Sequence, residues 1–283
     1  MFLEHAKRGD FRPLAVEVPF GLPGGVSAYP VDVPGHGQVL LRGRIDRVDV
    51  ARMGSRAYFR VVDYKSSKNK LDLLEVYYGL SLQLLVYLAV VLEKWNELAT
   101  GAFALTAGPA ERRGDLGRVT PYPAGAVYLP MHDPFIRSDG PLDGAKAWAE
   151  RKKNLKMAGL LLEDIDVLRL MDSAASGYSD ILPVQFTKAG GIGANSQTLA
   201  GSDLELLLGY VEHKLSQICA DIIAGKIDIR PYRRNRETAC THCEFSPVCT
   251  FDVLVEGNEY NTLSNLSKAQ IWEEIREIMR GGE

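Results

Sequence analysis

The sequence predicts an α/β protein with a central mixed sheet, flanking helices and a Cys-rich C-terminal arm. Segments rich in β-branched and aromatic residues are followed by long stretches with helical periodicity, which favours a mixed α/β class. One of these strand-like segments, Ala57 to Lys65, ends in two charges. Three of the four cysteines lie within ten residues near the C-terminus, at Cys240, Cys243 and Cys249.

Composition limits the classes of function that the chain can have. The 283 residues are 46% hydrophobic and 24% charged, which is ordinary for a globular protein. No apolar run approaches the roughly 20 residues of a membrane helix, and the start does not resemble a signal peptide, so we expect no membrane partner and a cytoplasmic location. The net charge of −3 means that any nucleic-acid contact must come from local basic clusters, each of which alone is more typical of a solvated face. These clusters are Lys65, Lys68 and Lys70; Arg151, Lys152, Lys153 and Lys156; and Arg233, Arg234 and Arg236.

The first predicted strand runs from Arg12 to Phe20 and contains an acid, Glu17. Glu17 is either a site acid or an ordinary acid on the outer face of the strand. The residues before this strand favour the end of a helix near Gly9, and residues 21–25 favour a turn.

The second predicted strand, Gln38 to Val50, contains a glycine and an acid that both suit a site. Gly43 inside a strand indicates close approach of backbone or ligand. Asp46 is either a site acid or one half of a surface ion pair with Arg44 or Arg47.

The third predicted strand, Ala57 to Lys65, brings the chemistry together. Asp63 and Lys65 lie two positions apart and therefore point to the same face. A turn over residues 51–55 makes the strand return antiparallel, which brings Asp46 close to Asp63. Two acids can hold a divalent cation, and the neighbouring amine can stabilise charge on phosphorus. Taken alone, such an Asp-x-Lys pair is more often an exposed salt bridge.

A helical pattern over Leu71 to Leu98 follows the third strand. Gly79, Gln83 and Tyr87 recur at i+4 spacing and share one face of that helix. Gln83 and Tyr87 could reach the site with hydrogen-bonding groups, or could form the polar edge of a buried helix.

The rest of the chain gives shorter predictions. Strands are expected at residues 101–107, 125–131, 159–171 (with a turn of helix) and 181–187, loops at 108–123, 132–145 and 190–195, and helices at 145–157, 202–224 and 267–279. Ser202 and Glu205 form a capping-box pattern, and Gly225 suits the end of that helix. Ser264 or Ser267 is expected to cap the last helix.

The cysteine spacing C-x2-C-x5-C indicates thiolate ligation of a metal or cluster in a cytoplasmic chain. A structural zinc or a cubane cluster takes four ligands, and this segment supplies three. Cys219 lies among apolar neighbours and is most simply a buried thiol. His242 stands between two ligands, where the chain would have to fold sharply. The fourth ligand is therefore expected outside the chain.

The ordered motifs resemble those of one nuclease family. The order is Glu17, Gly43-Arg-Ile-Asp46-Arg, Asp63-Tyr-Lys65 and Gln83-Leu-Leu-Val-Tyr87, and it resembles the PD-(D/E)XK nucleases of the RecB type, whose core is restriction-endonuclease-like. Ile229-Arg-Pro and the cysteine pattern resemble the iron–sulfur nuclease domain of AddB-type proteins in AddAB helicase–nucleases. The similarity runs from about Arg12 to Asp252.

The resemblance implies a role for each matching residue. Asp46, Asp63 and the backbone carbonyl of Tyr64 would hold Mg²⁺ or Mn²⁺, and Lys65 would orient the attacking water and stabilise developing charge. Glu17, Gln83 and Tyr87 would complete the wall of the active site. Cys240, Cys243 and Cys249 would ligate a [4Fe–4S] cluster, and the absence of a fourth cysteine allows for its loss.

The resemblance also implies a domain organisation and an activity. Residues 1–225 would form the nuclease core, with its N-terminal part and the family's metal-binding His lying upstream of the chain, because His5 is too close to Glu17 to be that His. Residues 226–283 would form the cluster-binding arm. The function would be Mg²⁺-dependent exonuclease cleavage of single-stranded, 5′-ended DNA unwound by an AddA-type helicase partner in double-strand break repair and recombination. The alternatives are a non-catalytic DNA-binding or scaffold module with a nuclease-like fold, and a zinc-stabilised interaction domain.

Overall fold

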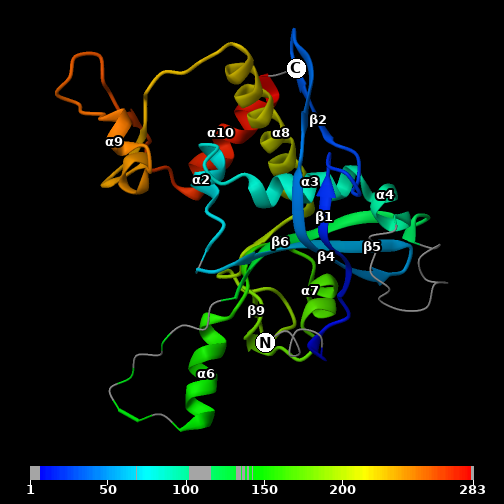
Figure 1. Cartoon of the computed structure of the whole chain (residues 1–283). Coiled ribbons are helices and arrows are strands. Elements are labelled where there is room, and N and C mark those ends of the chain that lie inside the picture. The colour runs from blue at the N-terminus through cyan, green and yellow to red at the C-terminus, as the bar shows by residue number, and fades with distance from the viewer. Residues whose placement is uncertain are drawn as a thin grey trace.

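A six-stranded mixed sheet forms the centre of the molecule, and helices cover both of its faces (Figure 1). The computed structural model describes residues 7–67, 69–101, 116–131, 135, 138, 140–141 and 143–281. The strand order is β1-β4-β5-β6-β7-β10. The strands are β1 (Arg12–Phe20), β4 (Gly43–Met53), β5 (Arg56–Lys65), β6 (Thr120–Pro130), β7 (Ala158–Leu162) and β10 (Thr198–Leu199). The predicted α/β class with a central mixed sheet is confirmed.

Strand direction changes at β5, in the middle of the sheet. β1, β4 and β5 are antiparallel neighbours, β6 runs parallel to β5, and β7 is antiparallel to β6. β10 then pairs in parallel with β7. β5 is therefore central, and seven consecutive residues from Ala57 to Asp63 are buried.

The larger helical layer covers the face of the sheet on which Phe59 packs against Trp95. It contains α2 (Leu73–Tyr77), α3 (Gln83–Glu93), α4 (Trp95–Thr100), α8 (Gly201–Ile223) and α10 (Lys268–Gly281). Two further helices, α6 (Gly144–Asn154) and α7 (Ile165–Met171), lie on the other side of the sheet in Figure 1. No helix in the described ranges combines the length and the apolar composition needed to cross a membrane.

Short strands form three satellite ribbons. One contains β2 (Tyr29–Val33) and β3 (Gly37–Leu41), and a second contains β8 (Gly177–Tyr178) and β9 (Gln185–Phe186). The third belongs to the C-terminal arm and contains β11 (Tyr232–Arg234), β12 (Glu237–Thr238) and β13 (Asn261–Thr262). The arm also holds a 3₁₀ turn, η1 (Ala239–His242), and a short helix, α9 (Ser246–Cys249).

Three predicted elements differ from the structure for local reasons. The expected helix over residues 71–98 is divided into α2, α3 and α4, because Gly79 adopts a left-handed φ of 80° and ends the first segment. The expected strand over residues 38–50 is divided at Arg42 into β3 and β4. Ser202 is not a cap, because α8 begins one residue earlier and Ala200 occupies that position.

Other predicted boundaries agree closely with the structure. β1 coincides with the predicted first strand, and Gly225 follows α8 with a φ of 68°. Ser267 caps α10 through a reciprocal pair of hydrogen bonds with Gln270. The predicted loop over 108–123 gives way to strand β6 from Thr120 onward, and the predicted strand over 181–187 is reduced to β9. The strand expected at residues 101–107 lies almost entirely outside the described residues.

Candidate active site

The hairpin of β4 and β5 places two acids side by side at its open end. The hairpin turns at Gly54 and Ser55, and its last recorded pair is Arg47 with Val62. The next position in that register puts Asp46 opposite Asp63, and directly opposed residues of an antiparallel pair share one face. The Tyr64 amide donates a hydrogen bond to Asp46 Oδ2 at 2.8 Å, which fixes this carboxylate against β5.

Asp63 is a buried acid with an oxygen that the protein does not satisfy. The residue is 2% exposed, and its Oδ2 accepts no hydrogen bond of normal geometry from the described residues. Its close polar neighbour is the Lys65 ammonium, 2.8 Å away. Burial raises the pKa of Asp63, Lys65 opposes that rise, and the Asp46 carboxylate adds to it. The two acids are therefore close enough to repel each other, as two ligands of one cation must be.

Lys65 is connected to the helical layer through two polar side chains. Its ammonium donates to Gln83 Oε1 at 3.3 Å, and Gln83 Nε2 donates to the Tyr87 hydroxyl at 2.9 Å. The Tyr87 ring meets the Phe20 ring edge-on, with centroids 6.1 Å apart. A methyl group at Gly43 would lie 2.8 Å from Phe20 Cζ, so the close approach expected at this glycine is the packing of Phe20.

Glu17 lies at the rim of this arrangement. It falls on β1 between Val16, which pairs with Arg47, and Val18, which pairs with Ile45. Its side chain is 63% exposed and forms an ion pair with Arg44 at 3.6 Å. Its φ of 47° is left-handed, a conformation that costs a non-glycine residue about 1–3 kcal/mol and is often found at functional sites. The structure thus puts Glu17 beside Asp46 in sequence register without a contact to the acid pair.

The alternative that Asp46 forms a surface pair with a neighbouring arginine is wrong. Arg44 pairs with Glu17, and Arg47 pairs with Asp49 at 2.5 Å. Asp46 accepts the Tyr64 amide instead.

Sequence reasoning missed a buried charge network on the other face of the same hairpin. Asp49 is fully buried and accepts hydrogen bonds from both Arg47 and Arg60. Arg60 is 3% exposed and lies over the Phe11 ring, while Arg47 also reaches the Tyr64 hydroxyl at 3.4 Å. The period-2 spacing of Arg47 and Asp49 in a strand is the signal that could have revealed the pair.

The acid pair fits a hard divalent cation. Mg²⁺ takes one or two carboxylates and keeps several waters, so Asp46, Asp63 and a backbone carbonyl would suffice. The unsatisfied Asp63 Oδ2 is the atom that a cation would satisfy. Among the described residues no group of three or more His, Cys, Asp or Glu side chains could hold a metal, so the site offers two carboxylates and no third ligand of these types.

The three cysteines of the arm do not fit a four-ligand cluster. Cys240, Cys243 and Cys249 are half-buried free thiols, and within the described part of the chain they are not gathered into a metal-binding group. Cys240 belongs to η1, whereas Cys249 ends α9. Cys219 is 5% exposed in α8, where burial raises the pKa of its thiol, so it is the buried thiol that its neighbours suggest.

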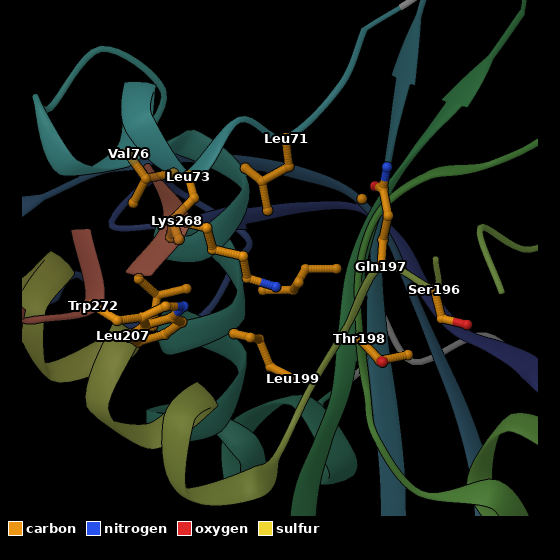
Figure 2. Close-up of a pocket in the computed structure, with 12 residues that line it drawn as sticks. Leu71, Leu73, Val76, Ser196, Gln197, Thr198, Leu199, Leu207, Lys268 and Trp272 are labelled. Atoms are coloured by element: carbon orange, nitrogen blue, oxygen red, sulfur yellow. The ribbon is translucent and has the colours of Figure 1, made fainter. Parts of the chain in front are cut away.

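A cavity of about 190 Å³ lies between α2, β7, β10, α8 and α10, away from the acid pair (Figure 2). Leucines such as Leu71, Leu199 and Leu207 line most of it, and Lys268 reaches across it. It contains no carboxylate and therefore offers no metal site.

Comparison with known proteins adds a family to this geometry. Residues 1–250 match the family described as the PD-(D/E)XK nuclease superfamily. Three relatives are named as the B-type component of an ATP-dependent helicase/deoxyribonuclease. The protein of Moorella thermoacetica is 40% identical over 93% of this chain and 21% of its own length. The Desulforamulus reducens protein is 39% identical over 98% and 22%, and that of Bacillus thuringiensis strain Al Hakam is 39% identical over 99% and 23%. The chain thus spans about a fifth of the length of these relatives.

Proposed function

This chain belongs to the PD-(D/E)XK nuclease superfamily, and from that premise we propose that it is a metal-dependent deoxyribonuclease domain. The observation that carries the proposal is the convergence of Asp46 and Asp63 across the β4–β5 hairpin, with the Lys65 ammonium 2.8 Å from Asp63. Support also comes from the buried, unsatisfied Asp63 oxygen, because a protein has no reason to bury such an atom unless a ligand completes it.

The proposed chemistry assigns a separate task to each side chain. Asp46, Asp63 and the Tyr64 carbonyl would hold Mg²⁺ or Mn²⁺, which when bound lowers the pKa of water and polarises a phosphate. Lys65 would orient the attacking water and donate to the phosphate oxygens as negative charge develops. Gln83 would hold the Lys65 ammonium in place, and Tyr87 would hold Gln83, through the two hydrogen bonds between them.

The relatives' shared name supports a larger assembly. We propose that the domain works within a helicase–nuclease that acts in double-strand break repair and recombination in the cytoplasm, with an AddA-type helicase as partner. The substrate would be single-stranded DNA released by unwinding, and the strand cut would be the one that ends 5′. Glu17 would line the rim of the DNA path. Residues 1–225 would form the nuclease core and residues 226–283 the cysteine-bearing arm.

A [4Fe–4S] cluster on the arm would need a ligand from outside it. Cys240, Cys243 and Cys249 supply three thiols at most, and Cys219 is buried in the core. We infer that any cluster requires a fourth ligand from a further part of a longer protein. Absorbance near 400 nm and iron analysis of the purified chain test this, because stoichiometric iron in these 283 residues alone would contradict it.

Cleavage of labelled single-stranded DNA with and without Mg²⁺ tests the nuclease proposal. Asp63→Ala should abolish cleavage, and Lys65→Ala should reduce it by about 10²–10³-fold, the usual cost of losing one stabilising donor. Asp228→Ala, an exposed acid on the arm, is the matched control and should cleave like the wild type. A wild-type chain that binds DNA but never cleaves it with Mg²⁺ or Mn²⁺ would favour a non-catalytic DNA-binding module.

A further inference from the structure

A groove of about 550 Å³, here called the α6 groove, lies outside the acid pair. Ala145, Trp148, Lys152 and Lys156 line one side of it, and Tyr178 and Asp180 line the other. The hydrogen bond from the Met157 amide to the Ile181 carbonyl, at 3.1 Å, ties the two sides together. Its size is within the range of ordinary ligand sites.

The helical side of the groove is a face that the fold itself does not use. Ala145, Trp148 and Lys152 follow one another at spacings of three and four, so they form a single stripe along α6. α6 has no buried residue, and Trp148 is 42% exposed. The Lys152 ammonium lies 5.9 Å from the centre of the Trp148 ring. On the opposite side, Tyr178 is 60% exposed. Two aromatic faces thus remain open to solvent across one groove.

The sheet register places this groove close to the catalytic acids. Asp63 pairs with Tyr128 on β6, and Tyr128 pairs with Ala158 at the start of β7. Neighbouring strands are about 4.8 Å apart, so the backbone of Ala158 lies about 10 Å from that of Asp63. Lys156 precedes Ala158 by two residues. Figure 1 shows α6 on the side of the sheet where β5 and β6 end.

The charges of the groove favour a polyanion. Lys153 pairs with Glu150 at 2.5 Å, and Asp180 pairs with Arg8 at 3.5 Å. Lys156 has no ion-pair partner within the described ranges, and burial lowers the pKa of its ammonium, although Asp180 opposes that shift. A phosphate at this position would restore the favourable environment that the ammonium lacks.

Building on the nuclease function proposed above, we propose that the α6 groove binds the single-stranded DNA next to the scissile phosphate. Trp148 and Tyr178 stack on unpaired bases, and Lys152, Lys153 and Lys156 contact the phosphates. Stacking platforms flanked by lysines are the usual means of holding a single strand without reading its sequence. A duplex does not suit the groove, because its bases are already stacked on one another.

Binding of a dT20 oligonucleotide in EDTA, followed by fluorescence anisotropy, tests the groove without any cleavage. Trp148→Ala and Tyr178→Ala should each weaken binding by roughly 5- to 150-fold, the range found for loss of one stacked base. Lys156→Gln should reduce the slope of log K against log salt by about 0.7, the value for one phosphate contact on a single strand. Lys146→Gln is the matched control, since Lys146 lies on α6 but outside the groove.

Tryptophan emission gives a second, independent readout. Of the three tryptophans, Trp95 and Trp272 are buried and Trp148 is exposed, so dT20 should quench Trp148 and Trp148→Phe should lose the quench. Equal binding by Trp148→Ala, Tyr178→Ala and the wild type would overturn the proposal, as would equal losses for Lys156→Gln and Lys146→Gln or tighter binding of duplex than of dT20. A groove that binds dT20 in a chain that never cleaves would overturn only the nuclease function, and cleavage that is insensitive to these variants would overturn only the groove.

Discussion

Gly43→Ala tests whether the active site depends on the packing beneath it. The added methyl group would lie 2.8 Å from Phe20 Cζ and 2.9 Å from Phe20 Cε1. Phe20 is 3% exposed and packed against Tyr87, so it cannot move freely. Overpacking of this kind costs about 1–3 kcal/mol of unfolding free energy. Each kcal/mol corresponds to about 2–4 °C in the melting temperature of a large domain.

The same substitution should reach the chemistry. Displacement of Phe20 pushes on Tyr87, whose hydroxyl accepts the hydrogen bond from Gln83, and Gln83 in turn accepts from Lys65. A misplacement of about 1 Å at a reacting group can cost roughly 100-fold in rate. We therefore expect Gly43→Ala to cut single-stranded DNA up to about 100-fold more slowly than the wild type, with a lower melting temperature.

The assays are thermal unfolding and Mg²⁺-dependent cleavage of a labelled oligonucleotide. Gly201→Ala is the matched control, because a methyl group there would lie 3.8 Å from Leu162 Cδ1, an ordinary contact. Phe20→Leu combined with Gly43→Ala should cost less than the sum of the two single changes, since the smaller side chain removes the clash. A Gly43→Ala protein that melts and cleaves like Gly201→Ala would refute the packing argument, and the melting temperature alone decides its first step.

Three further predictions concern the buried charges. Burial raises the pKa of Asp63 above its unfolded-state value, so the stability contributed by its protonated form is present below the unfolded value near 3.8 and is lost as pH rises through the folded-state value. Asp63→Asn should therefore be more stable than the wild type at about pH 7, and urea unfolding at a series of pH values should show this advantage shrinking toward about pH 4; an advantage that grows on acidification would contradict the sign. Mg²⁺ should raise the melting temperature of the wild type and leave that of Asp63→Asn unchanged, because ligand binding to the native state alone adds stability, and an equal shift in both proteins would place the cation elsewhere. Asp49→Ala should lower the unfolding free energy by about 3–5 kcal/mol, since it leaves the Arg60 guanidinium, 3% exposed, buried without its counter-ion; pairing it with Arg60→Met should recover part of that loss, and no recovery would argue against the ion pair as the cause.

The acid pair was predictable because its geometry is local. A hairpin with a tight turn fixes which residues face each other, so Asp46 and Asp63 could be brought together from the sequence alone. The period-2 rule also gave Lys65 the same face as Asp63. The contacts to Gln83 and Tyr87 depended on a helix that begins at Gln83, which the periodicity suggested without fixing where the helix starts.

Other features depended on backbone conformation or on distant partners. The break at Gly79 turns on a left-handed φ, which a glycine permits but does not require. β2 was missed because its five residues, Tyr29–Val33, form a strand only when paired with β3. The buried pairing of Asp49 with Arg60 crosses the hairpin, and charged residues in a strand suggest an exposed face unless a partner is known. The α6 groove joins two segments that are distant in the sequence.

The return of α10 to the core has a consequence for limited proteolysis. Ile271, Trp272 and Ile275 are buried, and α10 packs on α2 and α8, whereas residues 226–262 contain no buried side chain. The arm is thus a long excursion anchored at both ends, and trypsin should nick it first, at Arg233, Arg234 or Arg236. The two fragments should nevertheless co-elute on a sizing column and separate only in denaturant, because the C-terminal fragment remains clasped through its helix.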